Sequence, residues 1–381
     1  GKAASLAVLF KNNFDIPATL CLSTRGFDQF MSQTRIRDKI MFELNRFNLD
    51  TVRWEELWDT ALRIRNMFLN TDFPKALEND ICRTAASFFN GRPLVVRSSA
   101  PGEDSRSHSF AGIHDSFLNI NGRKDLLKAV KLVWASLYSD AALLYRRVLN
   151  LDINAAKMAV VLQEMIPSDR SGILFTKDPS DTDLGVLESV YGLNQALVDG
   201  DVEPDRWQIK RKNSKIISHT AAKRIRLALP DQNDIQFQPL PDDLAGKPPL
   251  TKSQVRQVWD CGLAVESIFG QPQDIEFCFE GSRLVILQAR PVTSGKTDQN
   301  DKKSWYLSLH RSLDNLKKLY KKINQDLIPE MVETSGKLGA ISLEKLGNSR
   351  LADEINQRQE IYDHWVRVYW SDFIPFAHGI R

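Results

Sequence analysis

The sequence is poor in the features that mark several large protein classes. Its 381 residues include four cysteines, Cys21, Cys82, Cys261 and Cys278, with no CxxC pair and no histidine at zinc-ligand spacing. Neither a zinc site nor a disulfide framework is indicated, and we expect reduced thiols. No apolar run approaches the roughly 20 residues that cross a bilayer, and the start lacks a signal-peptide pattern. We therefore expect a cytoplasmic protein without a membrane partner.

The sequence also lacks a large excess of charge of one sign, and it lacks the common phosphate-binding loops. Lysine and arginine together number 51 against 48 acidic residues, a net charge of +3 that gives no argument for nucleic-acid binding. There is no GxxxxGK[ST], because Gly1-Lys2 is followed by Ala3, and no GxGxxG follows an expected strand. A nucleotide site in this chain therefore has to be built in another way.

What is present is an α/β pattern over most of the chain. A length of 381 residues predicts two or more domains or lobes. Short runs rich in valine, isoleucine and leucine alternate with helical periodicity up to residue 293. The expected strands are residues 93–99, 158–166, 171–176, 274–280 and 283–290. The expected helices are residues 3–11, 51–69, 74–90, 124–136 and 251–269.

The amino-acid composition changes after residue 293. Residues 294–304 are polar and turn-rich, which predicts a linker. Residues 305–328 and 351–370 carry apolar side chains at helical spacing, so residues 305–381 are expected to begin a helical domain. Because the first residue is Gly1, we expect the chain to be a segment of a longer protein.

Seven short motifs follow one another in residues 1–293. They are GKAASL (1–6), VVRSSAPGED (95–104), SFAGIHDSF (109–117), VVLQEMI (160–166), SGILFTKDP (171–179), YGLNQALVDGDVEPD (191–205), and DIEF with LQARPVT (274–293). The series resembles the pyruvate-phosphate-binding family, which occurs in phosphoenolpyruvate synthase, pyruvate phosphate dikinase and rifampicin phosphotransferase. The resemblance implies an α/β ATP-grasp fold in two lobes, here followed by an α-helical segment.

The resemblance also implies an activity. Members of the family transfer the β-phosphoryl group of ATP to a histidine on a separate domain, with ATP and Mg²⁺ as cofactors. We therefore expect a phosphohistidine domain as partner, downstream in the full-length protein, and a small-molecule acceptor. The acceptor stays open among pyruvate with water, pyruvate with phosphate, an antibiotic and another small hydroxyl compound.

Two basic residues have the chemistry of phosphate ligands. Lys2 opens a helix, where a compact positive charge lies beside free backbone amides; a solvated surface lysine is the alternative. Arg97 lies inside the apolar run LVVRSS, where its guanidinium needs an anionic partner, either a triphosphate or a structural carboxylate. Both match charged positions of the family's nucleotide site.

Two expected strands near residue 280 bring together carboxylates and their counter-charges. Asp274 and Glu276 lie two apart and point the same way, as Gln288 and Arg290 do on the next strand. Carboxylate oxygens suit magnesium, so Asp274 and Glu276 are the metal candidates. The resemblance places Glu276, Gln288 and Arg290 on nucleotide phosphates and metal, and gives the catalytic set as Arg97, Glu276 and Arg290.

The register of this hairpin tests the shared site. With a regular two-residue turn, Glu276 lies opposite Leu287, and Gln288 and Arg290 face away from it. An odd-numbered loop or a bulge instead pairs Glu276 with Gln288 and Asp274 with Arg290, with Ile275, Phe277, Leu287 and Ala289 forming an apolar face. We therefore predict an odd-numbered loop or a bulge.

The remaining nucleotide contacts follow from two further motifs. The Gln163 amide both donates and accepts, as the edge of adenine requires, although an ordinary strand-end glutamine is the alternative. The backbone of residues 164–166 is expected to complete the base pocket. Residues 98–117 are expected to form a mobile lid, in which Gly112 and Ser116 match phosphate-contacting positions of the family. Ile113 and His114 depart from the family, which usually has glutamine after the FAG triplet.

Two other kinds of function were weighed against a phosphotransferase. A non-catalytic ATP sensor that presents the helical segment to a partner has no need of every charged position, and an interaction scaffold leaves the buried charges unexplained. Ser218-His219-Thr220-Ala221 resembles a phosphorylated SHxA sequence, but it lacks the preceding glycine pair. We therefore do not expect His219 to carry a phosphoryl group.

Overall fold

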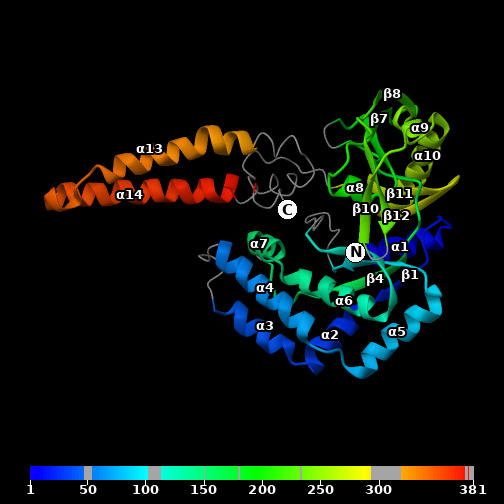
Figure 1. Cartoon of the computed structure of the whole chain (residues 1–381), viewed down its shortest axis with the longest axis horizontal. Helices are drawn as coiled ribbons and strands as arrows, with labels where there is room; N and C mark the ends of the chain where they lie inside the picture. The colour runs from blue at the N-terminus through cyan, green and yellow to red at the C-terminus, as the bar shows by residue number, and fades with distance from the viewer. Residues whose placement is uncertain are drawn as a thin grey trace. The chain divides into compact units, whose positions relative to one another are not determined.

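The computed structural model describes residues 1–46, 54–101, 113–149, 151–178, 181–231, 234–292, 319–373 and 376. The chain divides into two compact units, Gly1–Gly295 and Lys296–Arg381 (Figure 1). The expected linker, residues 294–304, lies outside the described residues.

The first unit contains a four-stranded antiparallel sheet, called the N-sheet here, in the order β1-β4-β2-β3. Its strands are β1 (Thr19–Leu22), β4 (Ala159–Glu164), β2 (Leu94–Ser99) and β3 (Ser116–Ile120). The central strand β4 has the sequence AVVLQE and is almost wholly buried, because it has a neighbour on either side.

Helices pack around the N-sheet and bury an aromatic core (Figure 1). They are α2 (Thr24–Gln33), α3 (Ile36–Leu44), α4 (Trp54–Asn70), α5 (Lys75–Phe89), α6 (Gly122–Ala135) and α7 (Asp140–Val148), with a 3₁₀ turn at Ser136–Tyr138. Phe30 stacks on Phe68, and Trp134 lies at 5.0 Å from Phe30 and 5.7 Å from Phe73 between ring centroids. Such large buried rings contribute much of the apolar area buried on this side of the N-sheet.

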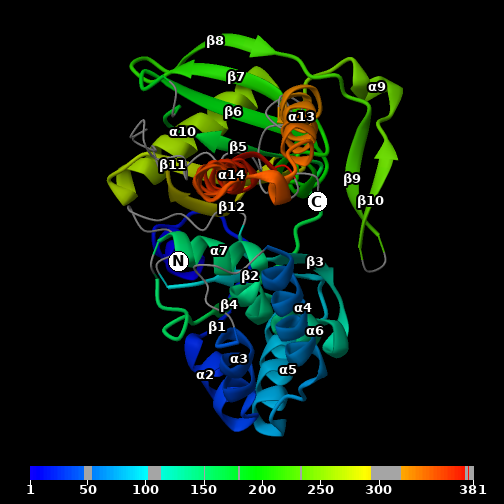
Figure 2. The same ribbon diagram turned by 90° about the vertical axis from the view of Figure 1, so that its left-hand side faces the viewer.

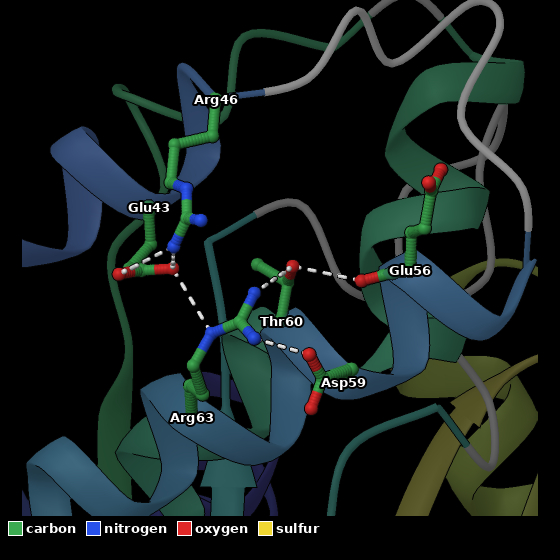
Figure 3. Close-up of polar contacts among 6 residues, drawn as sticks. All are labelled: Glu43, Arg46, Glu56, Asp59, Thr60 and Arg63. Atoms are coloured by element: carbon green, nitrogen blue, oxygen red, sulfur yellow. Dashed lines mark hydrogen bonds and ion pairs between the residues drawn. The ribbon is translucent and has the colours of Figure 1, made fainter.

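A polar network joins α3 to α4 (Figure 3). The Glu43 carboxylate, with a side chain 12% exposed, accepts from Arg46 at 3.2 Å and from the Arg63 Nε at 3.0 Å. Arg63 also donates to the Thr60 hydroxyl at 3.1 Å and pairs with Asp59. One guanidinium therefore ties the largely buried end of α3 to two successive positions of α4.

We expect Glu43→Gln to lower the free energy of unfolding by about 1–3 kcal/mol, because it removes hydrogen bonds to two charged groups and leaves them partly desolvated. Asp80→Asn is the control, since the Arg83–Asp80 pair is exposed at 80% and 68% and such pairs contribute about 0–1 kcal/mol. Denaturant unfolding of both variants checks this. Equal losses would show that the network does not stabilise the lobe.

The second sheet of the same unit, the C-sheet, is six-stranded with the order β12-β11-β5-β6-β7-β8. It consists of β12 (Arg283–Pro291), β11 (Gln273–Glu280), β5 (Arg170–Phe175), β6 (Leu184–Tyr191), β7 (Asp205–Lys210) and β8 (Lys215–Thr220), all paired antiparallel.

Two helices bury the apolar side of the C-sheet. The helix α10 (Lys252–Phe269) begins with a capping box between Thr251 and Gln254 and supplies Trp259 to the core. The helix α1 (Lys2–Lys11) packs on β12 through Leu6 and Leu9. The core also includes Val161 of the N-sheet strand β4, so the two sheets share apolar contacts.

A separate two-stranded hairpin lies beside the C-sheet (Figure 2). It consists of β9 (Arg226–Asp231) and β10 (Asp234–Pro239). Short helices precede and follow it, α8 (Gln195–Val198) and α9 (Asp242–Ala245).

The predicted register of the β11–β12 hairpin is confirmed. Glu280 pairs with Arg283 across a two-residue turn in which Gly281 has a positive φ of 60°. A bulge shifts the register between Phe277 and Glu276. As a result, Glu276 pairs with Gln288 and Asp274 with Arg290. The bulged Leu287 does not join Ile275 and Ala289 as expected. It packs instead in a separate cluster of Ile166, Cys278 and Val285.

The described part of the second unit is helical. It comprises a π-helical turn (Ile323–Leu327), α13 (Ile328–Gly339), a 3₁₀ turn (Leu343–Lys345), α14 (Asn348–Val368) and a second π-helical turn (Tyr369–Phe373). Leu319, Ile323 and Leu327 pack against Trp365 and other residues of the C-terminal helix.

The helix α13 begins at Ile328 and has Pro329 in its first turn, where a proline needs no amide donor. In the described parts of both units, no helix is long and apolar enough to cross a bilayer.

Candidate functional site

An ion pair joins the two sheets of the first unit. Arg97 lies on β2 and Glu276 on β11, and the Arg97 Nη2 donates to the Glu276 Oε2 at 2.7 Å. The two side chains are only 15% and 13% exposed. The Arg97 Nε is buried and has no hydrogen-bond partner within the described residues. The Arg97 guanidinium thus has donor capacity beyond Glu276, at a position between the sheets.

The surroundings keep Glu276 ionised. Burial by itself would raise the pKa of Glu276, but Arg97, Arg290 and Lys2 together outweigh burial and lower it. A carboxylate in such a position carries a full negative charge at neutral pH. Its charge is therefore available to a cation that competes with the arginines.

A second ion pair and an amide lie beside Glu276, on the hairpin strands β11 and β12. Arg290 donates to the Asp274 Oδ2 from Nη2 at 2.7 Å and from Nε at 2.9 Å, and the side chains are 13% and 6% exposed. Gln288, opposite Glu276, is buried, and its Oε1 has no hydrogen-bond partner in the described parts of the chain. The bulge therefore places all four predicted polar residues of this hairpin at paired positions.

The N-terminus of α1 meets the end of β2. The Lys2 Nζ donates to the Ser98 Oγ at 3.3 Å, and the Ala3 amide donates to the Ser99 Oγ at 3.2 Å. Both serines directly follow Arg97 on β2. The Lys2 charge and a helix N-terminus are thus brought beside Arg97, where both attract an anion.

His114 was not among the predicted site residues, yet it lies in this group. It is buried, and its Nδ1 lies 3.2 Å from the Ser136 carbonyl oxygen. Because a carbonyl only accepts, Nδ1 carries the proton. Burial, followed by the charges of Lys2 and Arg146, lowers the pKa of His114 to about 3. The ring is therefore neutral at physiological pH, and it stands at the position where the sequence departs from the family motif.

The pKa of His114 predicts acid sensitivity. Between pH 6.5 and about 3 the unfolded chain binds a proton at this ring and the folded chain does not. The free energy of unfolding therefore decreases as the pH is lowered through this range. From pH 6.5 to 5 the loss is about 2 kcal/mol. We expect His114→Gln to flatten the dependence of unfolding on pH over that range. Identical pH profiles for the parent and His114→Gln would contradict a neutral buried ring.

Two further predicted positions, Gly112 and Ser116, belong to the predicted lid, residues 98–117. Ser116 opens β3 and pairs with Arg97 in the register of the N-sheet. Gly112 and the rest of residues 102–112 lie outside the described residues. The expected lid role of residues 98–117 stays a prediction.

Gln163 lies where the two sheets meet. It is buried on β4, and its Nε2 is 3.4 Å from both the Thr19 Oγ1 and the Leu287 carbonyl oxygen of β12. The amides of Glu164 and Met165 already donate to the carbonyls of Ala18 and Pro93 at 2.8 and 2.9 Å. Base contacts by this segment would therefore use its carbonyl oxygens or the Ile166 amide.

His219 has a structural environment. Its Nε2 lies 2.6 Å from the Asp205 Oδ2, and its ring stacks on Trp207 with centroids 4.6 Å apart. Asp205 is fully buried and also accepts from Arg224. These contacts hold β7 and β8 together, as expected for a histidine that carries no phosphoryl group.

The family of the chain follows from comparison with known sequences. Residues 1–310 match the family model described as pyruvate phosphate dikinase, AMP/ATP-binding domain. The chain belongs to this family. Its two sheets belong to the part of the chain that this family model matches, and the expected α/β fold is confirmed.

Curated relatives of this AMP/ATP-binding domain are much longer proteins. The chain is 28% identical to a probable phosphoenolpyruvate synthase of Methanocaldococcus jannaschii over 80% of this chain and 26% of the relative. It is 32% identical to a rifampicin phosphotransferase of Streptomyces sp. over 77% of this chain and 34% of the relative. A phosphoenolpyruvate synthase of Aeropyrum pernix is 31% identical over 77% and 40%. The chain therefore spans less than half the length of these relatives.

Similarity to solved structures is weak. The D-alanine–D-alanine ligase of Bacillus anthracis aligns over 82% of this chain and 62% of the ligase, with a TM-score of 0.28 and 9% identity. This value is too low to support an inference about the site.

The hairpin residues of the AMP/ATP-binding domain fit a magnesium ion that is shared with phosphates. The described residues contain no group of three or more histidine, cysteine, aspartate or glutamate side chains that would hold an ion alone. Mg²⁺ in nucleotide sites usually takes one or two carboxylates together with substrate phosphates. Glu276 and Asp274 would supply the carboxylates, and the buried, unpartnered Gln288 Oε1 is a further acceptor oxygen.

Proposed function

We propose that the chain is the ATP-activating part of a dikinase-type phosphotransferase that passes the β-phosphoryl group of ATP to a histidine on another domain of the full-length protein, with AMP as one product and with the γ-phosphoryl group passing to water as inorganic phosphate. The observation that supports the proposal is a set of two largely buried ion pairs: Arg97–Glu276, which joins the two sheets, and Arg290–Asp274, which lies beside it within the C-sheet. Buried ion pairs are weak contributors to stability. A nucleotide site in which arginines exchange carboxylate partners for phosphates explains why these ion pairs are buried.

In this proposal the chain's own residues act by charge and position. Arg97, Arg290 and Lys2 receive the triphosphate, and their movement toward phosphate releases the carboxylates of Glu276 and Asp274. Magnesium, when bound to these carboxylates, neutralises phosphate oxygens in the transition state. Burial between the sheets excludes water, which strengthens each of these interactions.

Isotopic labelling of the full-length protein tests the reaction. Incubation with ATP labelled at the β-phosphorus is expected to give acid-labile label on a histidine outside residues 1–381, with formation of AMP. ATP labelled at the α-phosphorus is the control and transfers no label. Binding of ATP without AMP formation in the full-length protein would favour the sensor over the phosphotransferase.

Base selectivity is a separate prediction. Because the Gln163 amide has both a donor and an acceptor, we expect this chain to bind MgATP more tightly than MgGTP. Replacing Gln163 with leucine removes about one hydrogen bond to the base and is expected to reduce the preference about fivefold. Calorimetry with both nucleotides measures it. Equal affinity of the parent for ATP and GTP would contradict the role of Gln163.

A further inference from the structure

The β9–β10 hairpin is fixed to the C-sheet side of the first unit by close backbone contacts. Gly192, which follows β6, forms a parallel bridge with Ala228, and the Leu193 amide donates to the Ala228 carbonyl at 3.0 Å. Gly192 has a φ of +79°, and a Cβ at this position would lie 2.3 Å from the Ala228 oxygen. Only glycine permits this approach.

The other side of the hairpin is attached to the N-sheet. Strand β10 packs beside β3, which is an edge strand of the N-sheet, and Figure 2 shows the hairpin extending from the C-sheet toward β3. The Asn119 Nδ2 of β3 donates to the Asp231 carbonyl of β9. Asn119 is buried and has a φ of +53°, a conformation that asparagine tolerates better than most residues.

An apolar cluster closes the space between these attachments. Met165, Leu193, Ala196 and Ala228 are buried together, and Val95 and Ile235 pack against them. Val95 belongs to β2 of the N-sheet and pairs with Gln163, while Ala228 and Ile235 belong to the hairpin. The cluster therefore joins the two lobes directly beside the residue proposed to read adenine.

We propose that the β9–β10 hairpin is an interlobe clasp. It holds the N-sheet and the C-sheet together beside Gln163, so that opening of the nucleotide site takes place at the Arg97–Glu276 end. The two ends differ in chemistry: apolar packing and backbone hydrogen bonds hold the clasp, whereas an ion pair that phosphate can displace joins Arg97 to Glu276. The clasp therefore controls the dissociation rate of the nucleotide, although the hairpin does not contact the nucleotide. This effect on nucleotide rests on the function proposed above, whereas the clasp itself does not.

Asn119→Gly tests the clasp, because glycine permits the positive φ and removes the side-chain amide, which donates to the Asp231 carbonyl and accepts from Asn121 at 3.2 Å. Hydrogen exchange of the amides in residues 226–231 and 234–239 is expected to rise about fivefold, the effect of losing the hydrogen bond to Asp231. The dissociation rate of MgATP from the chain is expected to rise several-fold in parallel. Asn90→Gly is the matched control, since Asn90 has a φ of +52° at the exposed end of α5, and it is expected to change neither quantity.

Each outcome decides the proposal. Unchanged exchange of the hairpin in Asn119→Gly would overturn the clasp, as would faster exchange with an unchanged dissociation rate of MgATP. If the parent chain binds no MgATP, the proposed function fails. The clasp is then decided by hydrogen exchange alone, with faster exchange in β3 and the hairpin together supporting it and exchange confined to the hairpin overturning it.

Discussion

Replacing Arg97 with alanine is expected to weaken MgATP binding by about 1.5–3 kcal/mol, the range for a hydrogen bond to a charged group. Arg97 has spare donor capacity at Nε and lies between the sheets, and within the described residues its ion pair is the Nη2 contact to Glu276. A planar guanidinium in this position binds two phosphate oxygens at once. Titration calorimetry with MgATP measures the loss.

The substitution also affects the folded chain, so stability has to be measured separately. Removing Arg97 leaves the Glu276 carboxylate buried without its main partner, which costs about 3–5 kcal/mol for a buried pair. The double variant Arg97→Ala with Glu276→Gln removes both charges and is expected to recover most of that stability. It is not expected to recover MgATP binding, because no phosphate ligand is restored.

Arg211 provides a matched control. It forms an ion pair with Glu266 at 2.7 Å, with side chains 25% and 18% exposed, on the C-sheet side of the same unit. Arg211→Ala is expected to lower stability and to leave MgATP affinity unchanged. If Arg97→Ala and Arg211→Ala weaken MgATP binding equally, the loss reflects stability, and the site is not at Arg97.

Local periodicity was enough to predict much of the fold. The strands β2, β4, β5, β11 and β12 lie within one or two residues of the predicted ranges, because buried strands between helices leave a clear apolar signal. Strand parity also predicted that Glu276 and Gln288 pair. The pairing is achieved by a bulge and not by a longer loop, because Gly281 suits a two-residue turn. The alternation of side chains requires only that the loop residues and the bulge residues together make an odd number, so it does not show which of them supplies the extra residue.

Other features depend on contacts between residues far apart in sequence. His114 departed from the family motif, but nothing local shows that Lys2, Arg146 and the Ser136 carbonyl surround its ring. The β9–β10 hairpin was not predicted, and its function depends on Asn119 and Gly192, which precede it by many residues. Strand periodicity indicates which residues share a face but not which distant strand that face contacts, so the contact with β3 could not be predicted.

Contacts between the sheets also explain why the candidate site was easier to predict than its neighbourhood. Arg97 and Glu276 are 179 residues apart, yet each is a charged residue in an apolar strand. A buried charge requires a partner, so sequence alone indicates that each of them has one. The identity of the partner is a property of the fold.

Glu276→Gln is expected to remove the magnesium dependence of ATP binding while preserving the site for the phosphates. In the parent, the Glu276 carboxylate would hold Mg²⁺, and Arg97 would then be able to bind phosphate. A glutamine keeps the size of the side chain but lacks the negative charge that a carboxylate supplies to magnesium. It also leaves Arg97 without its counter-charge, so the affinity for ATP in the absence of magnesium is expected to be equal or higher. Calorimetry with and without MgCl₂ separates the two effects.

The same variant has a signature in acid. The pKa of Glu276 in the folded chain lies below its ordinary value of 4.5, so the carboxylate stabilises the fold above that value, and the stabilisation is lost as pH falls through the lower, folded pKa. Glu276→Gln lacks this titration, and its stability is expected to fall less steeply below about pH 4.3. Glu266→Gln is the matched control, because Glu266 is also paired with an arginine and also has a lowered pKa. Both glutamine variants should therefore flatten the acid limb of unfolding, but only Glu276→Gln should lose the response to magnesium. A magnesium response that survives in Glu276→Gln, or that disappears equally in Glu266→Gln, would show that the metal is not held at Glu276.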